Sequence, residues 1–288
     1  MKELIEVKKV KIAEREVFPI GLGTWNMGDD KEKYTQELNA LRSGLDAGIQ
    51  VIDTAEMYGD GNSESLIGDA IKPFEREKLY LVSKVLPNNA SKKQLPISLD
   101  NSLKRLKTDY LDLYLLHWQG SIPIEETIET MEKAKMQGKI KSWGVSNFDV
   151  TNMTKLLKQP NSHHCVTNQV RYNLGDRGID FDLVPMMKEN NMPLMAYAPV
   201  ARGDRLGSNL TKQKVLLDIS QKYNANVFQI LLAWCIRNGQ TIAIPQSSNT
   251  KHVISNVKSA NIQLTEEDLA KIDSVYPEPR VREPLALW

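Results

Sequence analysis

Two patterns of apolar residues alternate along the chain. Short apolar runs rich in strand-forming residues are followed by longer segments in which apolar positions recur with the spacing of a helix. The first pattern predicts buried strands and the second predicts amphipathic helices. The predicted strands cover residues 20–22, 51–53, 79–84, 111–116, 142–145, 165–169, 193–198 and 241–244. The predicted helices cover residues 34–47, 63–71, 94–106, 124–137, 150–157, 181–189, 212–223, 227–237, 252–259 and 266–275.

Eight strands that alternate with helices, without a linker or a break in composition, favour a (β/α)₈ TIM barrel that occupies residues 1–288 as a single domain. No Gly-x-Gly-x-x-Gly motif follows a predicted strand, which counts against a doubly wound dinucleotide-binding sheet. Residues 7–18 predict an N-terminal β-hairpin, and residues 266–275 an extra C-terminal helix. Residues 199–209 predict a long surface loop, and such loops in barrels usually carry function.

Composition narrows the class of partner. The 288 residues include 37 Lys and Arg against 36 Asp and Glu, so no basic field favours nucleic acid and a small molecule is the expected partner. The N-terminus lacks the apolar core of a signal peptide, and no apolar run approaches the roughly 20 residues of a membrane helix. We therefore expect a cytoplasmic protein with no membrane partner. Cys165 and Cys235 stand far apart among apolar neighbours and are expected to be buried thiols.

Polar residues stand where the predicted strands end. In a (β/α)₈ barrel the active site lies at that edge, so each polar residue there is a candidate. The candidates are Asp53, Lys84, His117, Ser146, Asn147, Asn168 and Gln169, and Tyr58 follows Asp53 closely enough to fold back over its strand.

Each candidate also has a structural interpretation. Asp53 could cap a turn or a helix, and Lys84 could extend to solvent along its aliphatic stem. His117 could be a core histidine, and the Ser146–Asn147 pair could cap the following helix. A carboxylate, a lysine, a histidine and a tyrosine that converge on one rim nevertheless favour a catalytic site.

This set of residues suits proton donation to a reduced carbonyl. A phenol is a weak acid at neutral pH, but a nearby ammonium such as that of Lys84 lowers its pKa. Asp53 would keep Lys84 protonated, and His117 would hydrogen-bond the carbonyl oxygen. No Ser or Cys nucleophile stands next to a base, and no set of metal ligands is evident.

The same residues belong to motifs whose order and spacing resemble those of the aldo-keto reductase family over almost the whole chain. The motifs are Gly-Leu-Gly-Thr-Trp at 21–25, Asp-Thr-Ala-Glu-Met-Tyr-Gly at 53–59, Lys84, Leu-Leu-His at 115–117, Gly-Val-Ser-Asn-Phe at 144–148, Asn-Gln-Val at 168–170 and Ala-Tyr-Ala-Pro at 196–199. The resemblance implies a (β/α)₈ barrel that reduces aldehydes or ketones with a nicotinamide cofactor.

The resemblance also implies roles for individual residues. It implies a catalytic tetrad of Asp53, Tyr58, Lys84 and His117, with Tyr58 as the general acid, and a substrate pocket formed by Trp25, Tyr58, His117 and Trp118. Ser146, Asn147 and Gln169 would hold the nicotinamide carboxamide, and Tyr197 would stack on the ring. Arg202 and Arg205 would lie near the pyrophosphate, although charges on a solvated loop are the alternative. The implied cofactor residues are Gly23, Thr24, Asp53, Ser146, Asn147, Gln169, Tyr197, Pro199, Arg202, Gln246, Ser247, His252 and Asn256.

One departure from the family pattern concerns the adenosine end of the cofactor. The family motif usually reads Ile-Pro-Lys-Ser and is followed by an arginine, whereas this chain has Gln246 at the lysine position and His252 at the arginine position. Ser247 and Asn256 are retained. The family mostly prefers NADPH, so we expect NADP(H) as the cofactor. Because both usual cations for a 2′-phosphate are missing, we expect that NAD(H) can also be used.

Two other functions compete with a reductase. Relatives that share this fold act as cofactor-binding regulatory subunits with little turnover, and these assemble with a membrane-protein partner. A Schiff-base aldolase would use Lys84 as its nucleophile, since lysines at the strand ends of barrels can do this. The nicotinamide-binding set argues against the aldolase.

Overall fold

A closed barrel of eight parallel strands forms the centre of the computed structural model, which describes residues 7–205 and 209–287. Neighbouring strands along the chain are neighbours in the sheet, and isolated bridges from Ile20 to Ala243 and from Gly23 to Gln246 join the first strand to the last. The strands are β3 (Leu22–Gly23), β4 (Val51–Asp53), β5 (Tyr80–Val85), β6 (Leu111–Leu116), β7 (Ile140–Ser146), β8 (Cys165–Arg171), β9 (Leu194–Tyr197) and β10 (Thr241–Ala243).

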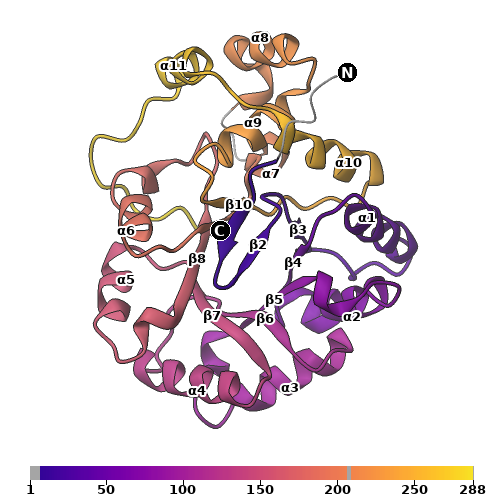
Figure 1. Ribbon diagram of the computed structural model, residues 1–288, viewed down its shortest axis with the longest axis vertical. Helices are drawn as coiled ribbons and strands as arrows, with labels where there is room; N and C mark the ends of the chain where they lie inside the picture. The colour runs from indigo at the N-terminus through magenta and orange to yellow at the C-terminus, as the bar shows by residue number, and fades with distance from the viewer. Residues whose placement is uncertain (1–6, 206–208, 288) are drawn as a thin grey trace.

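Helices surround the barrel, as Figure 1 shows. They are α1 (Tyr34–Asp46), α2 (Asn62–Ala70), α3 (Leu95–Leu106), α4 (Ile124–Met136), α5 (Val150–Leu157), α6 (Leu183–Glu189), α7 (Ala201–Asp204), α8 (Lys214–Lys222), α9 (Val227–Cys235), α10 (Thr250–Lys258) and α11 (Glu266–Val275). Strands β5 and β6 are buried at every position, because side chains fill the barrel on one face and the helices cover the other. Among the described residues, none of the helices is long and apolar enough to cross a membrane.

The N-terminal hairpin covers one end of the barrel. Strands β1 (Val10–Ile12) and β2 (Arg15–Val17) pair antiparallel, and their apolar side chains pack on the cluster inside the barrel. Arg15 forms an ion pair of 2.9 Å with Asp112, near the start of β6. The hairpin therefore covers the N-terminal ends of the strands and leaves their C-terminal ends available for a site (Figure 1).

The predicted fold class is confirmed, including the hairpin and the additional C-terminal helix. Cys165 and Cys235 are both buried and free, as expected. The first strand begins two residues later than predicted, because Ile20 makes only an isolated bridge and β3 begins at Leu22. The segment predicted as a long surface loop over 199–209 contains the short helical turn α7, in which Arg202 and Gly203 have left-handed φ values of 54° and 68°. Residues 206–208 of that loop lie outside the described part of the chain.

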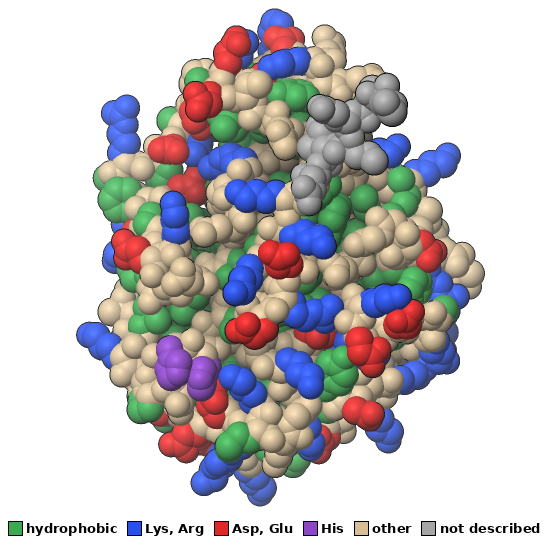
Figure 2. Space-filling model, viewed as in Figure 1, with side chains coloured by type: hydrophobic (Ala, Val, Ile, Leu, Met, Phe, Trp, Pro, Cys, Tyr) green, Lys and Arg blue, Asp and Glu red, His purple; other side chains and the backbone are tan. Residues whose placement is uncertain are grey.

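Charged side chains of both signs are interspersed over the face of the molecule drawn in Figure 2. This distribution agrees with the balance of 37 basic and 36 acidic residues in the chain. A mixed surface of this kind offers no single-sign field to attract a polyanion to this face.

Candidate active site

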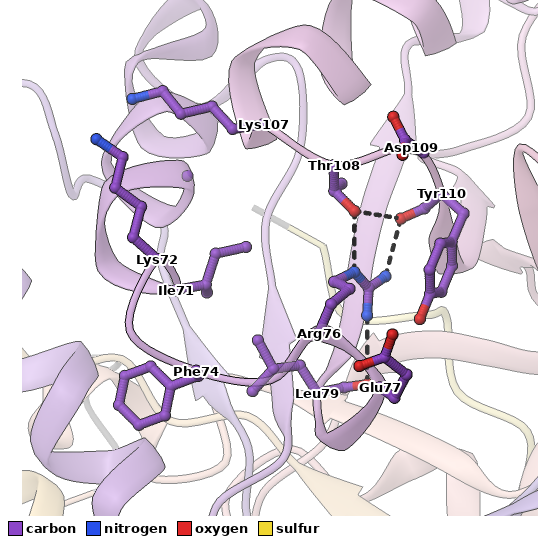
Figure 3. A pocket seen from close by; sticks show the side chains of 11 residues that line it. Ile71, Lys72, Phe74, Arg76, Glu77, Leu79, Lys107, Thr108, Asp109 and Tyr110 are labelled. Atoms are coloured by element: carbon purple, nitrogen blue, oxygen red, sulfur yellow. Dashed lines mark hydrogen bonds between the residues drawn. The ribbon is translucent and has the colours of Figure 1, made fainter.

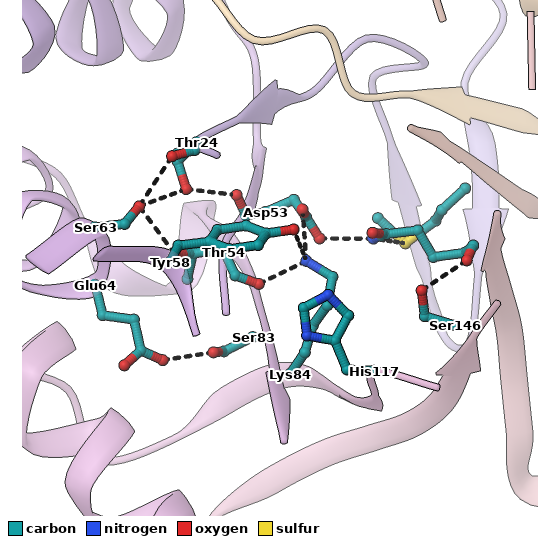
Figure 4. Close-up of polar contacts among 12 residues, drawn as sticks. Thr24, Asp53, Thr54, Tyr58, Ser63, Glu64, Ser83, Lys84, His117 and Ser146 are labelled. Atoms are coloured by element: carbon teal, nitrogen blue, oxygen red, sulfur yellow. Dashed lines mark hydrogen bonds and ion pairs between the residues drawn. The ribbon is translucent and has the colours of Figure 1, made fainter. Parts of the chain in front are cut away.

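Three adjacent strands bring the predicted tetrad together at their C-terminal ends. Asp53 ends β4, Lys84 is the penultimate residue of β5, and His117 directly follows β6. Tyr58 lies in the connection from β4 to α2 and returns over the strand ends, so its hydroxyl faces Lys84 (Figure 4). Strand pairing explains why Asp53, Lys84 and His117 converge, because β4, β5 and β6 are successive neighbours in a parallel sheet.

The side chain of Lys84 is fully buried and uses all three of its donors. Its Nζ donates to Asp53 Oδ2 at 2.8 Å, to the backbone oxygen of Thr54 at 2.7 Å and to Tyr58 Oη at 3.1 Å. Burial, the largest single influence, would lower the pKa of Lys84, but the charges of Asp53 and Tyr58 and their hydrogen bonds to the ammonium together outweigh it, so the pKa is raised. Lys84 is thus an ammonium at neutral pH. An aldolase needs a neutral amine with a free electron pair, so this arrangement argues against a Schiff-base role.

The hydroxyl of Tyr58 is a protonated donor at neutral pH. Burial raises the pKa of Tyr58, the positive charge of Lys84 opposes this, and the charge of Asp53 adds to the increase. We expected the charge of Lys84 to lower the pKa of Tyr58. This expectation is wrong for the net shift, because the loss of water around the phenolate raises the pKa more than the charge of Lys84 lowers it. The contribution of Lys84 keeps its predicted sign.

The imidazole of His117 is neutral. Burial and the charge of Lys84 lower the pKa of His117 to about 2. Its ring lies edge-on to that of Tyr58, with 5.8 Å between centroids, and 4.8 Å from the ring of Trp118. Nδ1 is buried without a hydrogen-bond partner among the described residues. A proton on Nδ1 would be an unpaired buried donor, so the tautomer with the proton on Nε2 is favoured.

The residues implied for the carboxamide lie beside the tetrad on β7 and β8. Gln169 Nε2 donates to Asp53 Oδ1 at 2.6 Å, and Ser146 Oγ donates to the backbone oxygen of Gln169 at 2.8 Å. Asn147 Nδ2 donates to the backbone oxygen of His117 at 3.0 Å, and its Oδ1 accepts from Tyr197 Oη at 2.9 Å. A hydroxyl, two amides and an aromatic ring fit a planar carboxamide, which needs both donors and acceptors.

The residues implied for the rest of the cofactor come from the two ends of the sheet. Gln246 and Ser247 follow β10, while His252 and Asn256 lie one turn apart on α10. Arg202 places its guanidinium 5.0 Å from the ring centroid of Trp25, across the mouth from β9 to β3. The remaining members are Gly23, at the closing bridge, Thr24, which follows β3, Pro199, which is buried after β9, and Arg205, which is exposed after α7.

A cavity of about 450 Å³ lies at the opposite end of the strands (Figure 3). Its walls include Arg76 and Tyr110, which lie just before β5 and β6, and none of the tetrad. Arg76 is already held by Thr108 Oγ1 at 3.0 Å and by the backbone oxygen of Tyr110 at 2.8 Å. Because this end of a barrel serves stability, we do not assign the candidate active site to this cavity.

Sequence reasoning missed four polar residues behind the tetrad. They are Thr54, Ser63, Glu64 and Ser83, and the structure buries all of them. Glu64 and Ser63 stand in the first turn of α2. The available signal was that Ser63 and Glu64 directly follow a predicted active-site loop. In the sequence, however, a serine and a glutamate at this place are also typical of the exposed first turn of a helix.

Comparison with known proteins identifies the relatives of this chain. The model of the Aldo/keto reductase family matches residues 19–277. Methylglyoxal reductase YeaE of Escherichia coli (strain K12) is 46% identical over 91% of this chain and 92% of its own. Glyoxal reductase of Bacillus subtilis (strain 168) is 32% identical over 91% of this chain and 90% of its own. An aldo/keto reductase from Klebsiella pneumoniae, solved in complex with NADP and acetate, is 44% identical, covers 98% of this chain and 99% of its own, and has a TM-score of 0.96.

Fold and site together define a class: a (β/α)₈ barrel with a buried Asp-Lys-Tyr-His set at its C-terminal rim. The chain belongs to the aldo/keto reductase family and is an oxidoreductase. The predicted resemblance is confirmed. The roles of individual site residues stay predictions.

Proposed function

We propose that the protein reduces small aldehydes, and 2-oxoaldehydes such as methylglyoxal and glyoxal in particular, with NADPH. Relatives named as methylglyoxal and glyoxal reductases, together with an NADP complex of a 44% identical structure, support this choice. The observation that carries the proposal is the set of three hydrogen bonds from the buried Lys84, one of which reaches the hydroxyl of Tyr58 at 3.1 Å.

In this mechanism Tyr58 is the general acid. NADPH supplies the hydride when it is bound, held by Ser146, Asn147, Gln169 and Tyr197. The Nε2–H of the neutral His117 hydrogen-bonds the carbonyl oxygen and orients it. As negative charge develops on that oxygen, Tyr58 gives up its proton, and the ammonium of Lys84 stabilises the phenolate that remains.

The regulatory-subunit hypothesis is not favoured. A protein that only binds a cofactor has no need for the complete set of Asp53, Tyr58, Lys84 and His117 at hydrogen-bonding and ring-contact distances. Burying a lysine and an aspartate also costs free energy of folding, which a catalytic requirement explains. The relatives described above are named as reductases.

The first prediction concerns substrate range. Trp118 has 39% of its surface exposed and Trp25 is half-buried, so the pocket offers apolar area and few specific polar contacts. Discrimination between apolar substituents is then modest, about 1 to 3 kcal/mol per methylene. We expect NADPH oxidation with methylglyoxal, glyoxal and several simple aldehydes. Steady-state kcat/KM over a carbonyl panel measures this, and an enzyme that accepted one sugar and rejected every simple aldehyde would contradict it.

The second prediction concerns the choice of cofactor. Gln246 and His252 stand where the family has cations, and both are exposed. A hydrogen bond to a charged group contributes about 1.5 to 3 kcal/mol, or roughly 10- to 150-fold in affinity. With these contacts weakened, NADPH should be preferred over NADH by less than about 10³-fold in kcat/KM, since Gln246, Ser247 and Lys251 can still donate to the phosphate.

Gln246→Lys should widen that preference, and added salt should reduce the gain because the contact is exposed. Lys258→Gln serves as the matched control, because it changes an exposed cation in the last turn of α10 and should leave the preference as in wild type. Kinetics with both cofactors at low and high ionic strength measures the effect. If wild-type enzyme excludes NADH and Gln246→Lys changes nothing, the phosphate is bound elsewhere, with Arg202 and Arg205 the next candidates.

A further inference from the structure

The segment that carries Tyr58 has three successive left-handed residues, of which only two are glycine. Gly59, Asp60 and Gly61 follow Tyr58 with φ values of 57°, 53° and 89°, all in the left-handed region. Glycine adopts this region freely, but Asp60 has a Cβ and does so at a cost. A conformation of this kind persists only when its surroundings fix it. Contacts at the ends of the segment therefore decide where the hydroxyl of Tyr58 lies.

One such contact is a chain of three buried hydroxyls that ends on the backbone of Asp53. Thr54 Oγ1 donates to Ser63 Oγ at 3.2 Å, Ser63 Oγ donates to Thr24 Oγ1 at 2.8 Å, and Thr24 Oγ1 donates to Asp53 O at 2.9 Å (Figure 4). The three hydroxyl residues are at most 1% exposed, so removing one hydroxyl would leave a buried polar group without a hydrogen-bond partner and without access to water. Ser63 is the member that joins α2 to the ends of β3 and β4.

A second contact joins α2 to β5. The carboxylate of Glu64 is fully buried and accepts from Ser83 Oγ at 2.5 Å and from Arg105 Nε at 2.6 Å. Ser83 is the residue before Lys84, so this bond fixes the strand next to the catalytic ammonium (Figure 4). Arg105 also lies against the end of the Tyr58 segment, because a Cβ on Gly61 would come within 2.5 Å of its side chain.

We propose that Ser63 and Glu64 are positioning residues for the proton donor Tyr58. They fix the start of α2 to the two strands that carry Asp53 and Lys84. The strained segment between β4 and α2 is then restricted to one conformation, which sets the position of the Tyr58 hydroxyl. This inference rests on the proposed function, in which Tyr58 is the general acid. Its consequence is that removing either anchor moves Tyr58 Oη relative to Lys84 and the substrate oxygen while the cofactor residues on β7 and β8 stay in place.

The test compares Ser63→Ala, Glu64→Gln and Glu64→Ala with matched controls elsewhere in the fold. Ser142→Ala removes a buried serine hydroxyl that donates to Asp112 O at 2.6 Å in the first half of β7. Asp268→Asn weakens a buried carboxylate paired with Lys222 at 2.8 Å on α11. For each protein we would measure the melting temperature, the Kd of NADPH by fluorescence, kcat and KM for methylglyoxal, and the isotope effect on kcat with NADPH deuterated at the transferred position.

Both Ser63→Ala and Glu64→Ala should lower kcat by about 10- to 100-fold with KM and the NADPH Kd changed little, because misplacing a reacting group by about 1 Å costs on that order. Their isotope effect should rise, since the chemical step becomes slower than product release. Glu64→Gln should lose less than Glu64→Ala, because its amide oxygen still accepts from Ser83. The controls should lower the melting temperature and leave kcat and the isotope effect as in wild type.

Loss of activity that only follows the loss of melting temperature, as in the controls, would overturn the positioning role. If Glu64→Ala does not fold, Glu64→Gln gives the same comparison, because it keeps the length of the side chain. Failure of the proposed function is a separate result: there, Tyr58→Phe itself would retain activity. When Tyr58→Phe is inactive and the anchor variants behave as the controls do, only this inference is wrong.

Discussion

Tyr58→Phe should lower kcat for methylglyoxal by about 10²- to 10⁴-fold, the usual contribution of a general acid. The change removes one hydroxyl, and with it the bond from Lys84 at 3.1 Å, but leaves the ring and its edge-on contact with His117. The hydride acceptor then lacks a proton donor, since burial and Lys84 lower the pKa of His117 to about 2 and keep it neutral. Binding of NADPH should be unchanged. Steady-state kinetics and fluorescence titration of the cofactor measure the two quantities.

Tyr34→Phe is the matched control for this change. The hydroxyl of Tyr34 is likewise hydrogen-bonded to a charged side chain, since it donates to Asp69 Oδ2 at 2.6 Å, but it lies at the start of α1 outside the tetrad. It should keep wild-type kcat. A Tyr58→Phe protein that retained most of its reductase activity would show that another group supplies the proton.

Lys84→Met should abolish reduction and also destabilise the fold. The ammonium is buried against Asp53, and removing it leaves a carboxylate without its positive partner. Breaking a buried ion pair in this way costs about 3 to 5 kcal/mol of the free energy of unfolding. The exposed pair Lys214–Asp218 offers the control, because Lys214→Met should cost only about 0.2 to 1 kcal/mol. Denaturant unfolding and kcat measure both effects.

The double variant Asp53→Asn/Lys84→Met separates stability from catalysis. It removes both charges, so most of the lost stability should return, and Gln169 can still donate to the oxygen of Asn at position 53. Activity should not return, because Tyr58 still lacks the ammonium that stabilises its phenolate. A double variant that regained activity would rule out a direct role for Lys84, and a stable, active Lys84→Met would rule out the whole arrangement.

Much of the site was predictable from the sequence, because strand ends and motif positions can be located from local patterns of residues. A βα repeat places every strand end at one rim, so Asp53, Lys84 and His117 were expected to converge from their positions alone. The sheet order confirms the neighbourhood of these strands. The replacement of the family's lysine by Gln246 was also visible in the sequence. Positions within a motif can be compared without a structure.

Other features depended on contacts between residues far apart in the chain. The net pKa direction at Tyr58 follows from how much water the fold removes, and only the packed structure fixes that burial. The turn of α7 arises from left-handed residues that no periodicity marks. Ser63 resembled any exposed residue at a helix start until the fold placed it on Thr24, 39 residues away.

The sequence by itself determined the barrel, the family and the candidate site residues of this protein, since apolar periodicity and motif spacing are local properties that survive without tertiary contacts. Tertiary structure alone decided which of these groups are charged and how the hydroxyl of Tyr58 is held. Those properties depend on burial and on hydrogen bonds such as that between Glu64 and Ser83, 19 positions apart, which no local pattern encodes.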